Sequence, residues 1–445
     1  MWQIVVDAGE LAGPAEPIER AEPEGGVRSA WSLLRRNGDF RRLYLASLIS
    51  LGGDWFLLVA LFGLVLELTN SALAVAFVIA AQDLTYFIAS PAAGLLADRL
   101  DRRHLMVGAD LARMVLVLGF LFVRSGSTVW IAYVLLAVVA TFSAAFEPAS
   151  AAALPNLVES KDLATANALS GSLWGTMLAV GAALGGLVTA TLGRDTSIVV
   201  DSASFAVSAW LIFRVHGRFA EDRRHEVSPS LRAASVETVR FARKDHRVLA
   251  LLAVKFGWGV AGGVLVLIPL LANRQFHAGD VGVGLLMAGR GVGALIGPFV
   301  GRASLGPGDR RLFWAIGVAL AVFGVGYALL GLAPGLLLAM PAVALAHVGG
   351  GAQWTLSSYG LQRIVPDAIR GRIFAFDGML VTLTFGLSSL MTGWLADHVG
   401  ARSTALGMGA VAVVWAAIWA TLTTDVRRAT MLEGCGPASE VELLE

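Results

Sequence analysis

The feature that most constrains this chain is a succession of long apolar runs separated by short charged segments. A helix needs about 20 mostly apolar residues to cross a hydrocarbon core ~30 Å thick, since each residue adds ~1.5 Å. A loop exposed to lipid would leave its backbone groups without hydrogen bonds, so we expect every crossing segment to be a helix. Twelve stretches qualify, namely residues 43–66, 72–97, 105–123, 130–150, 163–192, 197–213, 248–271, 280–301, 312–333, 335–357, 372–396 and 403–423.

The composition supports a protein embedded in a bilayer. Hydrophobic residues make up 56% of the 445 and charged residues 15%, whereas a soluble domain carries about 25% charged residues. A soluble globule, a disordered scaffold and a nucleic-acid partner are therefore poor interpretations. Cys435 is the only cysteine, which excludes internal disulfides and cysteine-based metal sites. We expect no cofactor and no metal.

The distribution of basic residues predicts the orientation. With the N-terminus inside, 27 of the 34 Lys and Arg fall in inner segments and four in outer loops, and basic loops remain cytoplasmic. We therefore expect a multi-pass protein of the cell (inner or plasma) membrane with both termini cytoplasmic. Residues 1–42 begin with too short an apolar stretch for a signal peptide, so they are expected to be a disordered cytoplasmic segment, and residues 424–445 a cytoplasmic tail.

The two halves of the chain repeat one another. An offset of 207 residues places Pro91 on Pro298 and Gly193 on Gly400, so six spans recur as six spans with parallel topology. This predicts an N-terminal six-helix bundle over 43–213 and a C-terminal one over 248–423. The cytoplasmic linker, 214–247, is either an interfacial strap with a helix from Ser228 or a solvated basic segment.

The segment Gly94 to Arg103, GLLADRLDRR, lies between the second and third spans. It resembles the Gly-x-x-x-Asp-Arg-x-x-Arg-Arg signature of the major facilitator superfamily, and the residues that match are Gly94, Asp98, Arg99, Arg102 and Arg103. Asp98 could sit at a helix N-terminus or pair with an arginine and so form a gating latch; the alternative is a plain basic anchor. A second copy from Gly301 lacks the aspartate. A third, GWLADHVGAR from Gly393 to Arg402, falls on the outer side and is interpreted as a structural turn.

Three further segments resemble the branch of that superfamily that contains macrolide and enterobactin exporters: residues 153–169, 199–209 and 364–376. In span 5, residues 181–186 are similar to an element of drug:proton antiporters, with Ala182 in place of its proline. The resemblance implies an all-α integral membrane protein, with twelve helices in two six-helix bundles. It also implies a monomeric secondary transporter that exports small amphipathic organic molecules by alternating access, in exchange for protons.

Ionisable residues inside the spans are candidate functional residues, because inserting a charge at the bilayer centre costs roughly 2.5–3.5 kcal/mol of free energy. Asp54 and Arg290 each lie about 16 Å from the inner end of their spans. By resemblance, spans 1, 4, 7 and 10 line the substrate cavity, while spans 2, 5, 8 and 11 flank the contact between halves. The resulting cavity candidates are Asp54, Lys255 and His347, with Asp83, Arg290 and Asp377 beside the cavity.

Two roles are open for Asp54. It either exchanges a proton as the cavity alternates sides, a role for which Asp83 is the second candidate, or forms a permanent salt bridge to Lys255 or Arg290 that fixes packing. Asp83 and Arg290 are equivalent in the repeat and opposite in charge, so they could oppose one another across the cavity, and here a structural role is favoured.

Other polar residues of the spans have simpler interpretations. Asp110 and Arg113, three residues apart, are expected to form a local pair. Glu147 could meet an arginine of the 94–103 loop, and Asp201 is expected to be structural. The aromatic residues of the spans have two possible roles: they line a wall that contacts the substrate, or they pack in the ordinary way and face lipid. They are Trp55, Phe56, Trp174, Trp258 and Trp354.

The chain contains no phosphate-binding loop, zinc-protease or serine-hydrolase motif, so we do not expect an enzyme. An importer, a lipid carrier or a facilitator on the same fold is the nearer alternative to an exporter. A non-transporting membrane sensor or scaffold is the alternative from another class, and it would need a folded soluble domain that the short loops do not provide.

Overall fold

The computed structural model describes residues 27–217, 219, 239–306 and 311–427. Twelve helical segments in this part of the chain are long and apolar enough to cross a membrane, which confirms the predicted number. Eleven of them contain one long α-helix: α2 (Gly38–Thr69), α3 (Ala72–Arg99), α4 (Arg102–Leu118), α5 (Val129–Leu157), α6 (Leu163–Leu192), α7 (Arg194–Phe213), α11 (Gly279–Ser304), α12 (Leu312–Leu332), α13 (Leu336–Ile364), α14 (Asp367–Val399) and α15 (Ala401–Leu422). The remaining one is the segment His246–Gln275, which starts with α9 (His246–Gly262).

The segment that starts with α9 changes its winding half-way. It passes through a 3₁₀ turn at Gly263–Val266, the short α10 (Leu267–Leu270) and a π turn at Leu271–Gln275. The tightening follows close contact with α14, where the Gly263 amide donates to Ser388 Oγ at 3.2 Å. A side chain inserted into the backbone ladder is a usual cause of such irregularity.

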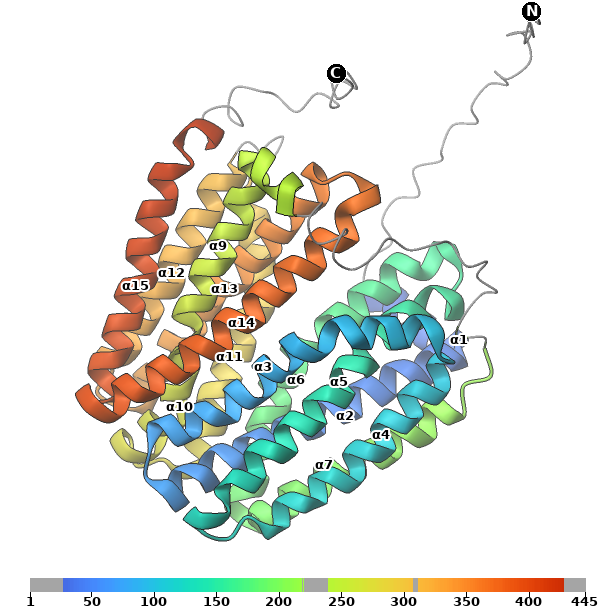
Figure 1. The fold of residues 1–445 in the computed structure, drawn as a ribbon, viewed down its shortest axis with the longest axis horizontal. Coiled ribbons are helices and arrows are strands. Elements are labelled where there is room, and N and C mark those ends of the chain that lie inside the picture. The colour runs from blue at the N-terminus through green and yellow to red at the C-terminus, as the bar shows by residue number, and fades with distance from the viewer. Residues whose placement is uncertain (1–26, 218, 220–238, 307–310, 428–445) are drawn as a thin grey trace, which may run out of the picture.

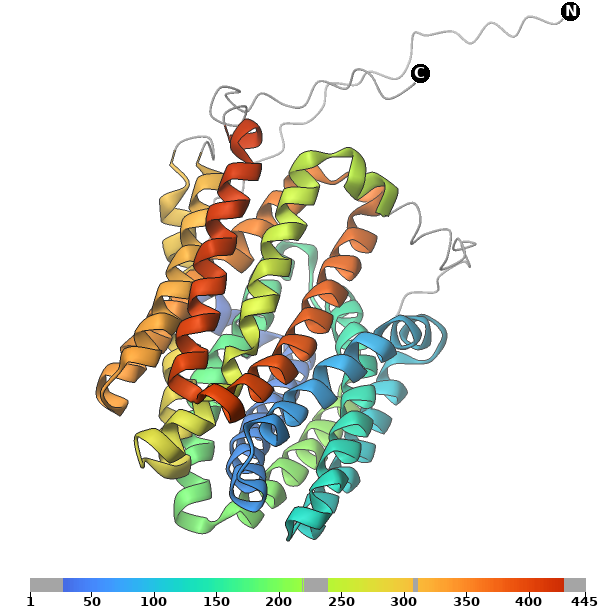
Figure 2. The same cartoon turned by 60° about the vertical axis from the view of Figure 1, so that its left-hand side comes forward.

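The helices form two groups, α2–α7 and α9–α15 (Figure 1; Figure 2). Between the groups, α6 packs on α11 and α3 packs on α14. The repeat is visible in the connections: Gly193 alone joins α6 to α7 and Gly400 alone joins α14 to α15, with φ of 87° and 86°. Only glycine adopts this region of φ readily, so the equivalence of these two glycines has a backbone cause.

The bundle has two distinct ends. We call the end that carries the starts of α2 and α9 and the connection between α3 and α4 the terminal end, and the opposite one the hairpin end. At the hairpin end the connection between α2 and α3 is only two residues long: Asn70 ends α2 in the left-handed region, and Ser71 caps α3 by accepting a hydrogen bond from the Ala74 amide at 3.2 Å. Short connections of this kind hold neighbouring helices antiparallel.

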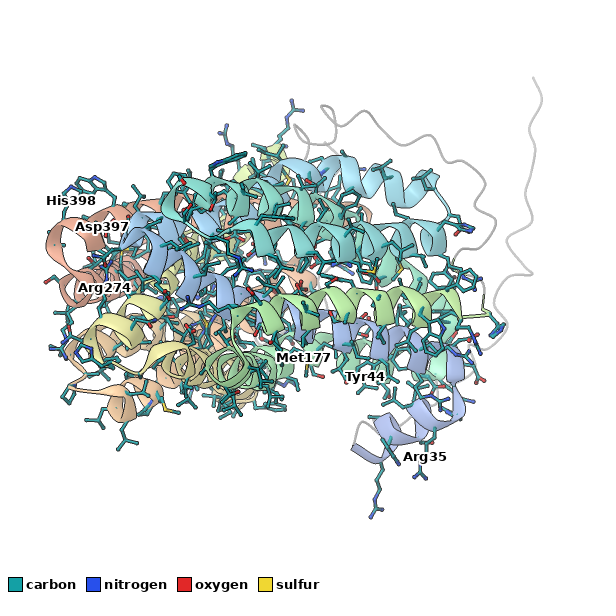
Figure 3. All side chains as sticks on the ribbon, turned by 90° about the horizontal axis from the view of Figure 1, so that it is seen from below. Arg35, Tyr44, Met177, Arg274, Asp397 and His398 are labelled. Carbon is teal, nitrogen blue, oxygen red and sulfur yellow. The ribbon has the colours of Figure 1, made fainter. Side chains whose placement is uncertain are left out.

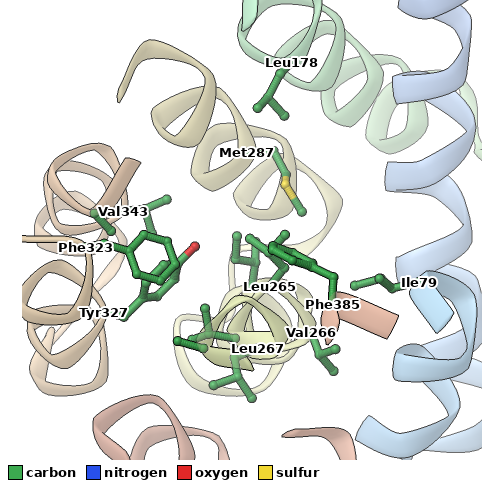
Figure 4. Packing of buried hydrophobic residues seen from close by; sticks show 14 of the residues in the cluster. Ile79, Leu178, Leu265, Val266, Leu267, Met287, Phe323, Tyr327, Val343 and Phe385 are labelled. Atoms are coloured by element: carbon green, nitrogen blue, oxygen red, sulfur yellow. The ribbon is translucent and has the colours of Figure 1, made fainter. Parts of the chain in front are cut away.

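Small residues allow α6 and α11 to approach closely. A methyl group on Gly284 would lie 2.7 Å from the Ala182 carbonyl oxygen, and one on Gly291 would lie 2.3 Å from the Ala179 amide nitrogen. These glycines of α11 therefore form a packing surface against α6. The apolar core is continuous across the halves, with Ile79 of α3 pointing toward Phe385 of α14 (Figure 4).

The two halves separate toward the terminal end. On α3, six of the nine residues from 72 to 80 are buried, whereas none from 81 to 91 is. On α14, six of the ten residues from 381 to 390 are buried but only two from 371 to 380. The two groups of ribbons correspondingly meet near the hairpin end and diverge toward the end that carries α1 (Val27–Arg36) (Figure 1).

The expectation of a disordered segment over 1–42 is wrong for its second part. Residues Val27–Arg36 form α1, and α2 already begins at Gly38. Leu33 of α1 is buried with Phe40 and Leu154. A search for apolar spans overlooks a short amphipathic helix of this kind. Residues 1–26, the linker from 220 to 238 with Ser228, and the tail beyond 427 lie outside the described residues, while residues 239–244 are helical.

Candidate functional site

Asp54 lies in the middle of α2, and its side chain is partly buried. The charges that act on it come from Arg113, Asp110 and Glu147 of the same half. Among the described residues it forms neither of the salt bridges considered for it, because Lys255 pairs with another carboxylate and Arg290 packs on aromatic rings. A permanent salt bridge from Asp54 to either residue is therefore wrong for this conformation.

The predicted local pair of Asp110 and Arg113 on α4 is present. The guanidinium lies between two rings, 4.8 Å from the centroid of Phe146 and 4.3 Å from that of Phe205. Such cation–π contacts hold a buried arginine in place. Arg113 is thus a fixed positive charge inside the N-terminal half.

Glu147 and Asp201 add two more carboxyl groups to the surroundings of Arg113. Tyr86 of α3 donates a hydrogen bond to Glu147. The Arg99 side chain lies outside the described residues, so the expected contact of Glu147 with an arginine of the 94–103 loop stays a prediction. Asp201 is fully buried, and Ser204 Oγ lies 3.4 Å from its Oδ1. The N-terminal half therefore gathers four carboxyl groups around one guanidinium.

The C-terminal half contains a closed ion pair. Lys255 of α9 is fully buried and pairs with Asp377 of α14, and it donates a second hydrogen bond to Ser358 Oγ at 3.0 Å. Its ammonium group also lies 4.4 Å from the ring centroid of Trp354. The structure thus brings together two site candidates, Lys255 and Asp377. Ser358 has no local sequence signal that separates it from any other serine within a span.

His347 lies beside a tyrosine that sequence reasoning missed. Its Nε2 is 2.7 Å from the Tyr327 hydroxyl, and both side chains are buried. Tyr327 is on α12 and His347 on α13, which pack against one another. A tyrosine 20 positions away becomes a partner only through this packing.

Arg290 occupies the contact between the halves. Its guanidinium lies 5.2 Å from the ring centroid of Trp174 and 5.9 Å from that of Trp55, both on the N-terminal half. Asp83 exerts a charge on Arg290 but is not in salt-bridge contact with it. The two therefore interact across the halves at longer range, consistent with their opposed placement in the repeat.

The aromatic residues form two groups rather than one wall. Trp55 and Trp174 are edge to face at 6.3 Å between centroids. Trp258 packs on Trp354 at 5.6 Å and on Phe385 at 5.0 Å. Trp174 and Trp354 remain 46% and 40% exposed, which leaves one ring of each group accessible.

The latch prediction for the 94–103 loop stays a prediction. The side chains of Asp98 and Arg99, and the surroundings of Gly94, lie outside the described part of the structure. Arg102 is buried and donates to the Ala152 and Phe219 carbonyl oxygens, at 2.8 and 3.0 Å, and Arg103 donates to the Phe213 carbonyl oxygen. These contacts tie the basic end of the loop to α5 and to the end of α7.

A sequence model of transmembrane secretion effectors matches residues 28–434. The chain belongs to this family of the major facilitator superfamily. Macrolide efflux protein A of Streptococcus pyogenes is 24% identical over 87% of this chain and 96% of its own length. The multidrug efflux pump Tap of Mycolicibacterium fortuitum is 27% identical over 84% of this chain and 93% of its own.

Solved structures agree with the fold. A transporter of the POT family, in complex with a thioalcohol-conjugated peptide, has a TM-score of 0.72 at 8% identity, over 87% of this chain and 96% of its own. A bacterial homologue of the human lysosomal transporter Spinster has a TM-score of 0.68 at 16% identity, over 93% and 100%. This member of the superfamily is thus a multi-pass membrane transporter for small-molecule substrates and not an enzyme.

Proposed function

We propose that this transporter exports small amphipathic organic molecules by alternating access, driven by protons that move inward. The names of its relatives, a macrolide efflux protein and a multidrug efflux pump, support export and this substrate class. The observation that carries the proposal is the meeting of the two halves at the hairpin end and their separation toward the terminal end.

We further propose that the terminal end is cytoplasmic. The segments predicted to be inner hold 27 of the 34 Lys and Arg, and the described parts of these segments lie at this end. Short basic loops are retained in the cytoplasm. The conformation described here would then be open to the cytoplasm, the side from which an exporter takes its substrate.

Asp54 is the proposed proton-exchanging residue. It lies half-way along α2, is partly exposed, and is in no salt bridge among the described residues. Binding a proton there would change the charge of the group of four carboxyls gathered around Arg113, and so the charge of the N-terminal half. Lys255 and Asp377 neutralise one another, which favours a structural role for that pair.

The test is proton-linked transport in proteoliposomes with a pH-sensitive dye inside. The panel contains a macrolide, a lipophilic cation and a catechol siderophore. We expect substrate-dependent proton movement with the unchanged protein, and loss of it with Asp54→Asn. Asp195→Asn is the matched control, because Asp195 is an exposed aspartate paired with Arg124 inside the same half. Unchanged transport by Asp54→Asn at every pH contradicts the assignment.

The same assay separates the alternatives. Accumulation of substrate on the cytoplasmic side would indicate an importer, and transport without proton movement would indicate a facilitator. Absence of transport for the whole panel, with folded protein in the vesicles, would favour a sensor or scaffold.

A further inference from the structure

The C-terminal end of α14 contacts the N-terminus of α3 at the hairpin end, although the two helices belong to different halves. Asp397 accepts three hydrogen bonds there: from Ser71 Oγ at 2.7 Å, from the Ala72 amide at 2.7 Å and from the Leu73 amide at 3.0 Å. The amides of a first helical turn have no partner within their own helix and favour a negative charge. Asp397 therefore caps a helix of the opposite half.

Close packing one helical turn earlier brings the carboxylate within reach. A methyl group on Gly393 would lie 2.6 Å from Ala76 Cβ and 2.8 Å from the Ala72 carbonyl oxygen. Residues four apart share one face of a helix, so Gly393 and Asp397 both face α3. The glycine permits the approach, and the aspartate binds the amides that the approach brings near.

A cation joins the contact from the C-terminal half. Arg274 donates to Asn70 Oδ1 at 2.9 Å, and its charge also acts on Asp397. The connection between α2 and α3, which consists of Asn70 and Ser71, is thus held by two residues of the other half. Figure 3 shows Asp397, His398 and Arg274 together, at the end of the molecule opposite Tyr44 and Arg35.

The sequence repeats the same spacing at the other end of the same helix pair. Gly94 and Asp98 precede the end of α3 as Gly393 and Asp397 precede the end of α14. Because α3 and α14 run antiparallel, the two copies lie at opposite ends of this helix pair. The segment Gly393 to Arg402 does contain a structural turn, at Gly400, and Asp397 adds a specific contact with the other half that the sequence did not reveal.

We propose that Asp397 is a positioning residue that holds the hairpin end closed and that its contact with α3 breaks each time this end opens. The proposal rests on the proposed function, since it assumes that the halves rock. Hydrogen bonds of 2.7 Å between different halves are lost when that end separates. Their strength therefore adds to the free energy that favours the closed hairpin end over the open one.

The test is a distance measurement by pulsed electron paramagnetic resonance in nanodiscs. Spin labels go on Ser127→Cys and Leu337→Cys, exposed positions at the hairpin end of the two halves, in a Cys435→Ser background. In Asp397→Ala we expect the ratio of separated to closed hairpin ends to rise about tenfold or more, because charge-assisted hydrogen bonds are lost. Asp397→Asn keeps one acceptor oxygen and should shift the ratio less. Asp195→Asn, which removes an exposed carboxylate from the same end, should leave it unchanged.

Ser71→Ala provides a second variant, because it removes one donor from the opposite half and leaves Asp397 intact. It should shift the ratio in the same direction as Asp397→Ala but by less. An unchanged ratio in both Asp397→Ala and Ser71→Ala overturns the proposal, as does a loss of thermal stability without any change of ratio. A single distance in the unchanged protein, with and without substrate and at every pH, would instead overturn the alternating access on which the proposal rests.

Discussion

At the scale of single residues, the two halves treat buried charge differently. The C-terminal half neutralises Lys255 with Asp377, whereas the N-terminal half sets four carboxyl groups around Arg113. A matched buried pair is costly to break, because removal of one partner leaves the other charge uncompensated. An unmatched group of carboxyls can take up and release protons. This asymmetry is the residue-level reason for assigning proton exchange to the N-terminal half.

The buried pair gives a stability prediction. Lys255→Met or Asp377→Leu alone should lower the free energy of unfolding by about 3–5 kcal/mol, since each leaves a lone buried charge. The double variant should recover most of that loss, because no charge remains. Thermal unfolding in detergent measures all three. A double variant as unstable as the two single losses added together would contradict a direct ion pair.

The spacing of residues along one helix could predict part of the site from the sequence alone. Asp110 and Arg113 were predictable as partners because three residues separate them on one helix. The partner of Glu147 was not, since Tyr86 is 61 positions away and meets it only when α3 and α5 pack. The partner of Asp397 was even less predictable from the sequence, because Ser71 is 326 positions away.

At the scale of helices, length and hydropathy predict the spans well because the bilayer imposes one requirement on all twelve. The same criterion overlooks α1, which is short and only half apolar, and which buries Leu33 through tertiary contact. Contact between helices depends on small residues, and their positions are visible in the sequence. Which glycine faces which helix becomes visible only in the structure.

The α6 to α11 contact supplies a prediction at this scale. A methyl group on Gly186 would lie 2.7 Å from the Asp280 carbonyl oxygen, so Gly186→Ala should lower stability by about 1–3 kcal/mol through overpacking. Gly171→Ala on the same helix meets nothing within 4 Å and should leave stability unchanged or raise it by about 0.5–1 kcal/mol. Thermal unfolding in detergent compares the two. Equal effects would show that the contact does not limit packing.

At the scale of the whole molecule, two six-helix groups meet along α6 with α11 and α3 with α14. Contacts that cross between the halves gather at the hairpin end. Besides Asp397 they include Arg194 of α7, which lies 3.3 Å from Asp280 of α11. The fold could be inferred from the repeat, whereas the end at which the halves are closed depends on contacts that only the structure reveals.

The proposed orientation predicts a difference in chemical accessibility. In intact cells that carry the Cys435→Ser protein, a membrane-impermeant maleimide should label Ser127→Cys but not His104→Cys. In inverted vesicles the pattern should reverse, because these exposed positions lie at opposite ends of the bundle. Labelling of His104→Cys from outside intact cells would overturn the orientation.

Alternating access is tested most directly by measuring both ends of the molecule in one set of conditions. One spin-label pair occupies Ser127→Cys and Leu337→Cys at the hairpin end, and a second occupies His104→Cys and Arg311→Cys at the terminal end. As pH and substrate are varied, we predict that the distance at the hairpin end lengthens as the distance at the terminal end shortens. Distances that change at one end only, or at neither end, would contradict the account.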